Sequence, residues 1–318
     1  MMEFFQTFLI AALQLLLVLL SAPLVNGIIK KTKARLQNRR GASVVQPYFD
    51  LFKLLRKEVI IPSTSSWIFR ITPYVAFTAT LIIALLVPTI FVPVPFHWVG
   101  DIITVIYLFA VGRFFVALAG IDAGSAFGGL GSSREMSIAS IIEPAMMLAI
   151  FTTAVTAGST DLSIIVNSLS TTSLSILQPS HLLAFVGLFI VTIAETGRIP
   201  VDNPATHLEL TMIHEAMILE YSGRYLAFIE WASQIKLVIF LSLLANMFVP
   251  LGMATDAGLI SLTVGLAAFA LKIFVLAIIV AVVETLNAKL RLFRVPELLM
   301  VAFVLSLIAL ILYFIIGS

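Results

Sequence analysis

The chain has no cysteine in its 318 residues. Cysteine thiolates bind iron–sulfur clusters and many structural zinc ions, and pairs of cysteines form disulfides. The sequence therefore excludes all three within this chain. Any redox centre that works with it must lie in another subunit or in a bound small molecule. No metal-binding site and no catalytic residue is predicted.

Charged side chains are scarce as well. Asp, Glu, Lys and Arg make up 11% of the residues and apolar residues 60%, whereas soluble domains carry about 25% charged residues. The mean hydropathy of +1.11 points the same way. So few charges exclude a soluble domain of this length, and the lipid bilayer, not nucleic acid, is the expected surrounding of the chain.

Long apolar stretches are what the sequence has instead. A transmembrane helix needs about 20 apolar residues, and the stretches that qualify or nearly qualify are 4–29, 69–92, 102–121, 136–157, 182–198, 226–250, 259–286 and 298–316. They predict an all-α, polytopic transmembrane bundle of about eight helices, with residues 1–318 in a single transmembrane domain. The Ser- and Thr-rich residues 168–174 are expected to form a loop.

Lys and Arg are distributed unevenly between the two ends of these stretches. With eight spans, every basic residue except Arg113, Lys236 and Lys272 falls in or beside the first, third, fifth and seventh connections. Cytoplasmic loops of membrane proteins carry such an excess. We therefore expect a multi-pass membrane protein with both termini on the non-cytoplasmic side.

The first connection contains an amphipathic segment. The sequence VVQPYFDLFKLLRKEVIIP places Phe49, Phe52 and Leu55 at helical spacing, with Asp50 and Lys53 on other faces. This pattern predicts an interfacial helix lying at the membrane surface.

Ionisable residues also occur inside the predicted spans: Arg113, Glu143, Glu195, Glu230, Lys236, Lys272 and Glu284. Each costs roughly 2.5–3.5 kcal/mol near the bilayer centre, so the set costs on the order of 20 kcal/mol before pairing. Ion pairs that only hold helices together would explain single residues. A proton or ion path explains the set better, because carboxylates and amines with shifted pKa values accept and pass protons.

The lysines and the arginine in these spans have different expected roles. A buried Lys ammonium is easily neutralised, so Lys236 and Lys272 can change charge when a neighbouring carboxylate does. Arginine keeps its charge. Arg113 is therefore expected to be a fixed counter-charge for a glutamate.

The connection 198–224 is dense in polar residues. If part of it is helical, His207, Thr211 and His214 share one face, and Glu209 and Glu220 share another. Two histidines without an evident third ligand are a weak metal signal. A charged cavity that faces a partner or a bound molecule is the preferred interpretation.

Ordered motifs resemble a known family. They read ARLQNRRGASVVQPYFDLFKLLRKEVIIP, GDIITVIYLFAVGRFF, GSSREMSIASIIEPAMML, GRIPVDNPA and LEYSGR, and they cover about residues 30–295. The chain resembles the H-type (heel) membrane subunit of respiratory complex I. It is most similar to the counterpart in formate hydrogenlyase and energy-converting membrane-bound NiFe hydrogenases.

The resemblance implies a non-catalytic subunit that docks a cytoplasmic electron-transfer arm and couples its redox reaction to proton or sodium translocation. It extends the path to Asp202, Glu209 and Glu220, which match the family's motifs. It assigns further residues to partner docking or to a cavity: Gln37, Arg39, Asp50, Lys53, Lys57, Arg134, Glu135, His207 and Tyr221.

The resemblance also implies a prokaryotic cytoplasmic (inner) membrane as the location, together with partners and cofactors. The partners would be hydrogenase-like large and small subunits, an iron–sulfur subunit and antiporter-like membrane subunits. The NiFe centre and the iron–sulfur clusters would be bound by those partners and no cofactor by this chain. In complex I the corresponding cavity admits quinone.

Departures from the complex I pattern favour the hydrogenase branch. The segment PATH places His207 where a carboxylate is usual, and ETLNAKLRLFRVPELLM replaces an arginine-rich block. Three alternatives remain open from the sequence. They are the quinone-chamber subunit of a complex I-like dehydrogenase, a stand-alone secondary ion transporter and an inert anchor.

Overall fold

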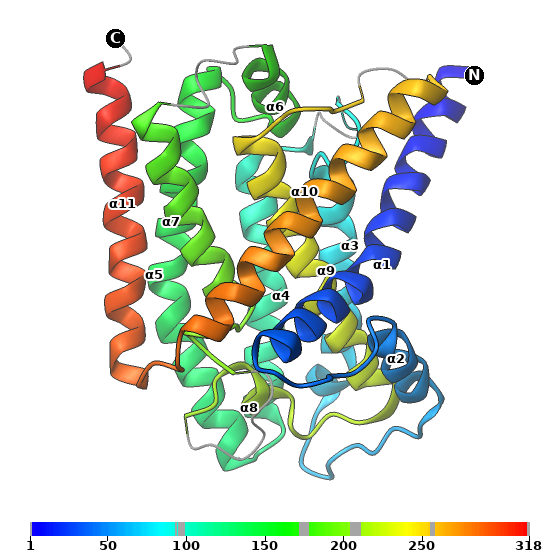
Figure 1. Cartoon of the computed structure of the whole chain (residues 1–318). Helices are drawn as coiled ribbons and strands as arrows, with labels where there is room; N and C mark the ends of the chain where they lie inside the picture. Colours follow the sequence, from blue (N-terminus) through cyan, green and yellow to red (C-terminus); the bar gives the residue numbers. More distant parts are fainter. Residues whose placement is uncertain are drawn as a thin grey trace.

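The computed structural model describes residues 2–92, 94, 99–171, 178–203, 211–254 and 258–316, and within them the chain is all-α (Figure 1). The helices are α1 (Met2–Leu36), α2 (Gln46–Arg56), α3 (Trp67–Leu86), α4 (Ile102–Asp122), α5 (Ala126–Ala157), α6 (Leu162–Thr171), α7 (Pro179–Glu195), α8 (His214–Ile218), α9 (Gly223–Phe248), α10 (Leu259–Leu286) and α11 (Val295–Ile316), with a 3-10 turn, η3, at Leu292–Arg294. Two isolated β-bridges, Phe91–Ala254 and Asp101–Asp161, are the only extended pairings in the described residues.

The predicted bundle of about eight spans is confirmed. Seven of the described helices are long and apolar enough to cross a membrane, and the eighth span is the 17-residue α7. The predicted ends are less accurate. Helix α1 continues to Leu36, and α5 begins at Ala126, ten residues before the prediction, so Arg134 and Glu135 lie on a helix and not in a connection.

Two shorter segments lie outside the spans. The amphipathic segment is helical as predicted: α2 buries Pro47 and Leu51 and leaves Phe49 and Phe52 exposed. The expected loop at 168–174 is wrong for residues 168–171, which belong to α6. Residues 172–174 lie outside the described part of the chain.

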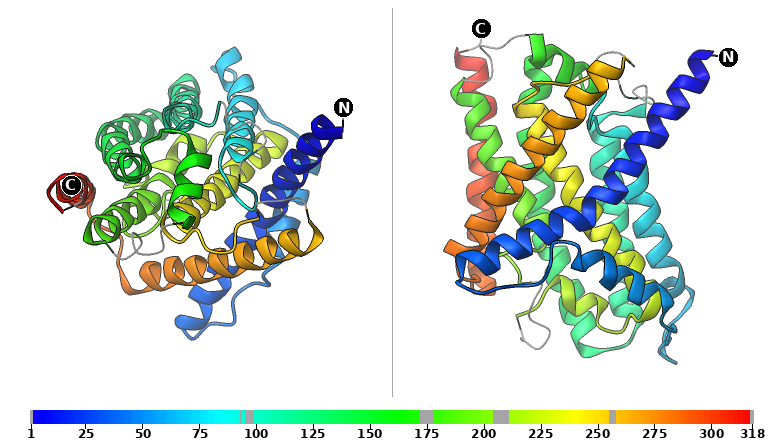
Figure 2. Two further views of the ribbon diagram at one scale, coloured as in Figure 1. Left: turned by 90° about the horizontal axis from the view of Figure 1, so that it is seen from above. Right: turned by 45° about the vertical axis from the view of Figure 1, so that its right-hand side comes forward.

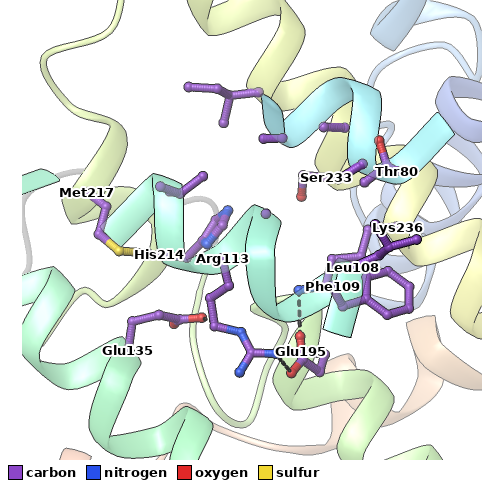
Figure 3. Close-up of a pocket in the computed structure, with 16 residues that line it drawn as sticks. Thr80, Leu108, Phe109, Arg113, Glu135, Glu195, His214, Met217, Ser233 and Lys236 are labelled. Carbon is purple, nitrogen blue, oxygen red and sulfur yellow. Dashed lines mark hydrogen bonds and ion pairs between the residues drawn. The ribbon is translucent and has the colours of Figure 1, made fainter. Parts of the chain in front are cut away.

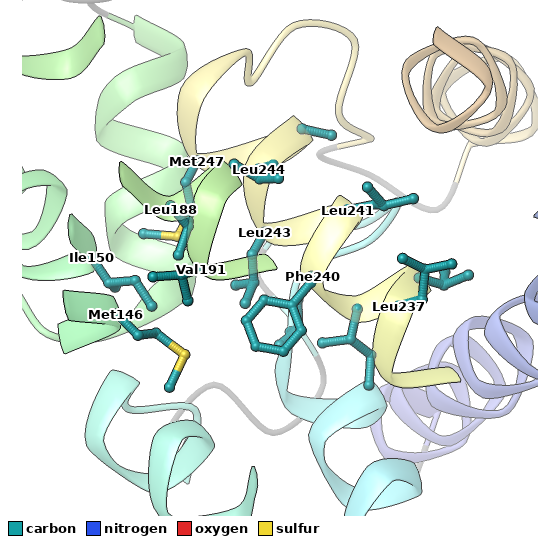
Figure 4. Packing of buried hydrophobic residues seen from close by; sticks show 14 of the residues in the cluster. Met146, Ile150, Leu188, Val191, Leu237, Phe240, Leu241, Leu243, Leu244 and Met247 are labelled. Carbon is teal, nitrogen blue, oxygen red and sulfur yellow. The ribbon is translucent and has the colours of Figure 1, made fainter. Parts of the chain in front are cut away.

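Helix α9 forms the centre of the bundle. Of its most apolar 18 residues, 67% are buried, which is a larger share than in any other described helix long enough to cross a membrane. Figure 4 shows its side chains between those of neighbouring helices, with Leu188 and Val191 of α7 and Met146 and Ile150 of α5 on one side. The Phe240 ring, fully buried, stacks on Phe109 of α4 at 4.8 Å.

The two ends of the bundle differ in character. Both termini lie at one end, and α2, α8 and the basic connections lie at the other (Figures 1 and 2). Helices α1 and α10 cross the bundle at a tilt and pack against each other. This arrangement matches the predicted alternation of eight spans.

The turn between α4 and α5 brings these two helices close together. Ser125 begins α5 by accepting a hydrogen bond from the Gly128 N–H. The Ser132 hydroxyl donates to the Ala117 carbonyl of α4. A Cβ at Gly128 would lie 2.1 Å from the Gly120 oxygen, so only glycine allows this approach.

A Gly128→Ala substitution should therefore destabilise the α4–α5 pair by about 1–3 kcal/mol through overpacking. The adjacent Gly129→Ala is the matched control, because a Cβ at Gly129 meets nothing within 4 Å. Thermal unfolding of the two purified variants in the same detergent measures the difference. Equal midpoints would contradict the close approach.

Candidate functional site

The site is built around Arg113, a buried guanidinium on α4. Its Nη1 lies 2.9 Å from Glu143 of α5 and its Nη2 lies 2.5 Å from Glu195 of α7. Its Nε lies 3.9 Å from Glu135 of α5. Arg113 is therefore paired with glutamates, as expected of a fixed counter-charge, and it joins three helices.

Glu195 is shared between two cations. Its Oε1 accepts from Arg113, and its Oε2 lies 2.5 Å from the Lys236 ammonium of α9. The Glu195 and Arg113 side chains are almost inaccessible, whereas the Lys236 side chain keeps 17% of its exposure. Figure 3 shows the Glu195 carboxylate between the two positive groups. Because both cations contact this carboxylate, protonating Glu195 would weaken its hold on both, while Arg113 would keep its pair with Glu143.

A second buried carboxylate repeats this arrangement. Glu284 of α10 lies 2.6 Å from Arg198 and 2.5 Å from Lys33 of α1. Arg198 also donates to the Asn26 side chain at 3.2 Å. These contacts tie α1, α10 and the segment after α7 together.

Asp202 is a third carboxylate whose two oxygens contact different segments of the chain. Its Oδ1 lies 3.1 Å from Lys289, in the connection between α10 and α11. Its Oδ2 accepts from the backbone N–H groups of Ile213 and His214, at the start of α8. In this way one carboxylate holds the connection between α7 and α8 against the connection between α10 and α11.

Two cavities border these clusters. The inner cavity has a volume of about 60 Å³ and is lined mostly by apolar residues together with Arg113, Glu135, Glu195, His214 and Lys236. The wider cavity has a volume of about 760 Å³ and opens among α1, α8, α9 and the segment after α7. Its lining carries both signs of charge: Lys30, Lys33, Arg39, Arg198, Glu215, Glu230 and Glu284.

Glu215, on the short helix α8, differs from an ordinary carboxyl group. Burial raises its pKa from 4.5 to about 7, Glu230 and Asp202 add to the rise, and His214 and Lys30 oppose it. The wider cavity therefore contains a carboxyl group that changes charge near neutral pH.

A model of the NADH dehydrogenase family matches residues 9–314. The chain belongs to the NADH dehydrogenase family. Formate hydrogenlyase subunit 4 of Escherichia coli (strain K12) is 35% identical over 93% of this chain and 95% of its own length, and hydrogenase-4 component C of the same strain is 33% identical over 94% and 93%.

Two further proteins are less similar to this chain. The H-type subunit of NADH-quinone oxidoreductase from Burkholderia vietnamiensis is 30% identical over 75% of this chain and 69% of its own length. A chain of the membrane-bound sulfane sulfur reductase, an archaeal respiratory membrane complex, has a TM-score of 0.80 and 22% identity, covering 96% of this family member and 99% of that chain. The latter likeness shows the fold.

The structure does not bring all residues of the predicted proton or ion path together. One cluster brings together Arg113, Glu143, Glu195 and Lys236. Glu284 and Asp202 each belong to a separate cluster. Lys272 instead donates to Asn246, which caps the turn at residues 88–89. Glu230 lines the wider cavity, and Glu220 is exposed. Glu209 lies outside the described residues.

The predicted docking and cavity residues are dispersed. Gln37 and Arg39 line the wider cavity. Asp50, Lys53 and Lys57 are exposed on or beside α2, and Arg134 donates to the Met212 carbonyl. Tyr221 stacks on Phe69 at 3.9 Å and donates to its carbonyl, so it packs the interior. His207 lies outside the described residues.

Five residues of the site are not predicted as members of it by the sequence: Asn26, Lys33, Arg198, Glu215 and Lys289. Asn26 carries a signal, because an amide within an apolar span needs a partner. Lys33 stands in a run of basic residues, and membrane topology alone would explain the positive charge of that run. Glu215 and Lys289 stand in polar connections, where charge is ordinary and gives no signal.

A Glu215→Gln variant tests the raised pKa. Because the folded protein holds this proton more tightly than the unfolded chain, wild-type stability should fall as pH rises from about 4.5 to 7 through this group. The variant should be more stable than wild type at pH 8, by on the order of 1–3 kcal/mol. Denaturant unfolding at pH 5 and pH 8 measures the difference, which should shrink at pH 5. A difference that is equal at both pH values would contradict the shift.

Proposed function

We propose that this chain, a membrane subunit related to those of complex I, works in a hydrogenase-type assembly. It docks an electron-transfer arm at the end that carries α2 and α8. It couples the redox reaction of that arm to proton or sodium translocation through its buried charges. The observation that supports this most directly is the sharing of Glu195 between Arg113 and Lys236 at the edge of a cavity.

The coupling would be electrostatic. A charge change in the wider cavity acts on Glu195 and Glu284, whose cationic partners come from different helices. In a low-dielectric interior such changes act strongly on neighbouring groups. Protonation or loss of a charge at one carboxylate shifts the pKa of the next, so the disturbance spreads from cluster to cluster.

The hydrogenase branch is supported by the extent of the likeness. The formate hydrogenlyase and hydrogenase-4 relatives match nearly the whole length of both chains, and the relative from NADH-quinone oxidoreductase matches 69% of its own length. The proposed partners are hydrogenase-like large and small subunits, an iron–sulfur subunit and antiporter-like membrane subunits. Those partners would hold the NiFe centre and the iron–sulfur clusters.

The orientation is part of the proposal. The end with α2, α8 and the basic connections would face the cytoplasm, because Lys and Arg concentrate on that side of membrane proteins. Both termini would then lie on the opposite side (Figure 1). The protein would reside in a prokaryotic inner membrane.

A quinone-reducing role is the second candidate, since one relative is named for quinone and the wider cavity is spacious. The residues present do not fit a quinone well. The described lining contains no Phe, Tyr or Trp, and its charged residues outnumber the few isoleucines and the leucine. Ligand sites of apolar molecules are mostly lined by hydrophobic and aromatic side chains. Nickel in the purified complex would favour the hydrogenase role, and quinone reduction would favour the second candidate.

The variant Lys236→Met tests the coupling role. It removes the exchangeable cation from Glu195 while keeping the length of the side chain, and Arg113 still pairs the carboxylate. In proteoliposomes containing the assembled complex, redox turnover should persist while translocated protons per turnover fall about 100-fold.

The control is Arg294→Met, which removes an exposed cation in the connection before α11. It should leave both quantities unchanged. Normal ion translocation by the Lys236→Met complex would leave only an anchoring role for the chain.

A further inference from the structure

The two cavities meet at three residues. His214, Ile229 and Ser233 line both the inner and the wider cavity. Among these, the imidazole of His214 is the titratable group. The inner cavity holds the Glu195 pairs and the wider one holds Glu215 and Glu230, so His214 stands between two sets of ionisable groups.

The backbone of His214 is held firmly. Its N–H donates to Asp202 Oδ2 at 3.0 Å, and Asp202 is held in turn by Lys289. A Cβ at Gly197 would lie 3.5 Å from the His214 Cβ, so the histidine packs against the turn that follows Glu195. Figure 3 shows its ring directed into the inner cavity beside Arg113.

His214 also acts electrostatically on both sides. It interacts with Glu195 of α7 and with its neighbour Glu215 on α8. The other titratable or charged groups that line the two cavities or contact the His214 backbone are Lys30 and Lys33 of α1, Arg39, Arg113 of α4, Glu135 of α5, Arg198, Asp202, Glu230 and Lys236 of α9, and Glu284 of α10. An added proton on His214 therefore falls within a set of groups of both signs of charge.

We propose that His214 is the proton relay between the wider cavity and the Glu195 cluster. The inference rests on the proposed coupling function and names a positioning and transfer residue for it. In the step, the O–H bond of protonated Glu215 breaks, a new N–H bond forms on the imidazole, and Glu215 is left as a carboxylate.

The imidazolium then competes for Glu195 with Lys236 and Arg113. A third cation at one carboxylate weakens the hold of the other two. When Glu195 accepts the proton, the N–H bond breaks, an O–H bond forms, and the neutral imidazole is ready for another proton. Imidazole suits this role because one ring nitrogen can accept a proton while the other donates one.

The test uses the assembled complex in proteoliposomes and two variants of His214. His214→Gln keeps a polar side chain but cannot relay a proton, so translocated protons per redox turnover should fall about 100-fold. His214→Ala leaves space beside the cavity. Added imidazole should restore translocation in this variant, and a series of methylated imidazoles should shift its pH profile in the order of their basicity.

The matched control is His181→Gln at the opposite end of α7, outside the described cavity linings. It should leave translocation and its pH profile unchanged. Wild-type translocation by His214→Gln would overturn the relay. So would a loss in both His214 variants that added imidazole does not reverse, because a purely structural role would give that result.

The relay and the coupling function fail in different ways. If Lys236→Met uncouples the complex and His214→Gln does not, the relay is wrong and the coupling function stands. If neither variant uncouples it, both are wrong.

Discussion

The structure depends on one constraint: a charge inside an apolar bundle must find a partner. Glu195 finds two, because its two oxygens contact cations from α4 and α9. Glu284 does the same with Arg198 and Lys33. Breaking a buried pair by removing one partner typically costs about 3–5 kcal/mol. These shared carboxylates therefore fix how α1, α4, α7, α9 and α10 are placed.

The same arrangement permits change. A carboxylate with two cations has two ways to redistribute its contacts when one neighbour gains or loses a proton. Apolar packing around α9 holds the helices while this happens, since the interior shown in Figure 4 is filled with large side chains and Phe240 is fully buried. The charged groups lie toward the end with the cavities. A rigid bundle beside an adjustable charge network is what electrostatic coupling needs.

Much of the fold is predictable because lipid imposes a simple rule on sequence. Spans must be long and apolar, so α9 and α10 can be located to within a few residues. Helix ends are predicted poorly where polar residues continue a helix beyond the apolar stretch. The tight Gly128–Gly120 approach, which lets α5 start early, leaves no trace in hydropathy.

The site is predictable in part for a similar reason. Arg113, Glu195 and Lys236 attract notice because charge is rare inside spans. Their pairing cannot be predicted from the sequence, since the partners come from helices distant along the chain. Lys33 is hidden among other basic residues, although it reaches Glu284. The raised pKa of Glu215 comes mainly from burial, with Glu230 and Asp202 adding to the rise, and the sequence reveals none of these surroundings.

Infrared difference spectroscopy of the assembled complex tests the central claim most directly. Spectra of the oxidised and reduced complex, compared between wild type and Glu195→Gln, isolate the bands of this carboxylate. We predict a redox-dependent shift of a carboxylate or carboxyl band that is lost in Glu195→Gln and altered in Lys236→Met. Identical redox difference spectra for wild type and Glu195→Gln would contradict the claim that Glu195 responds to the redox reaction.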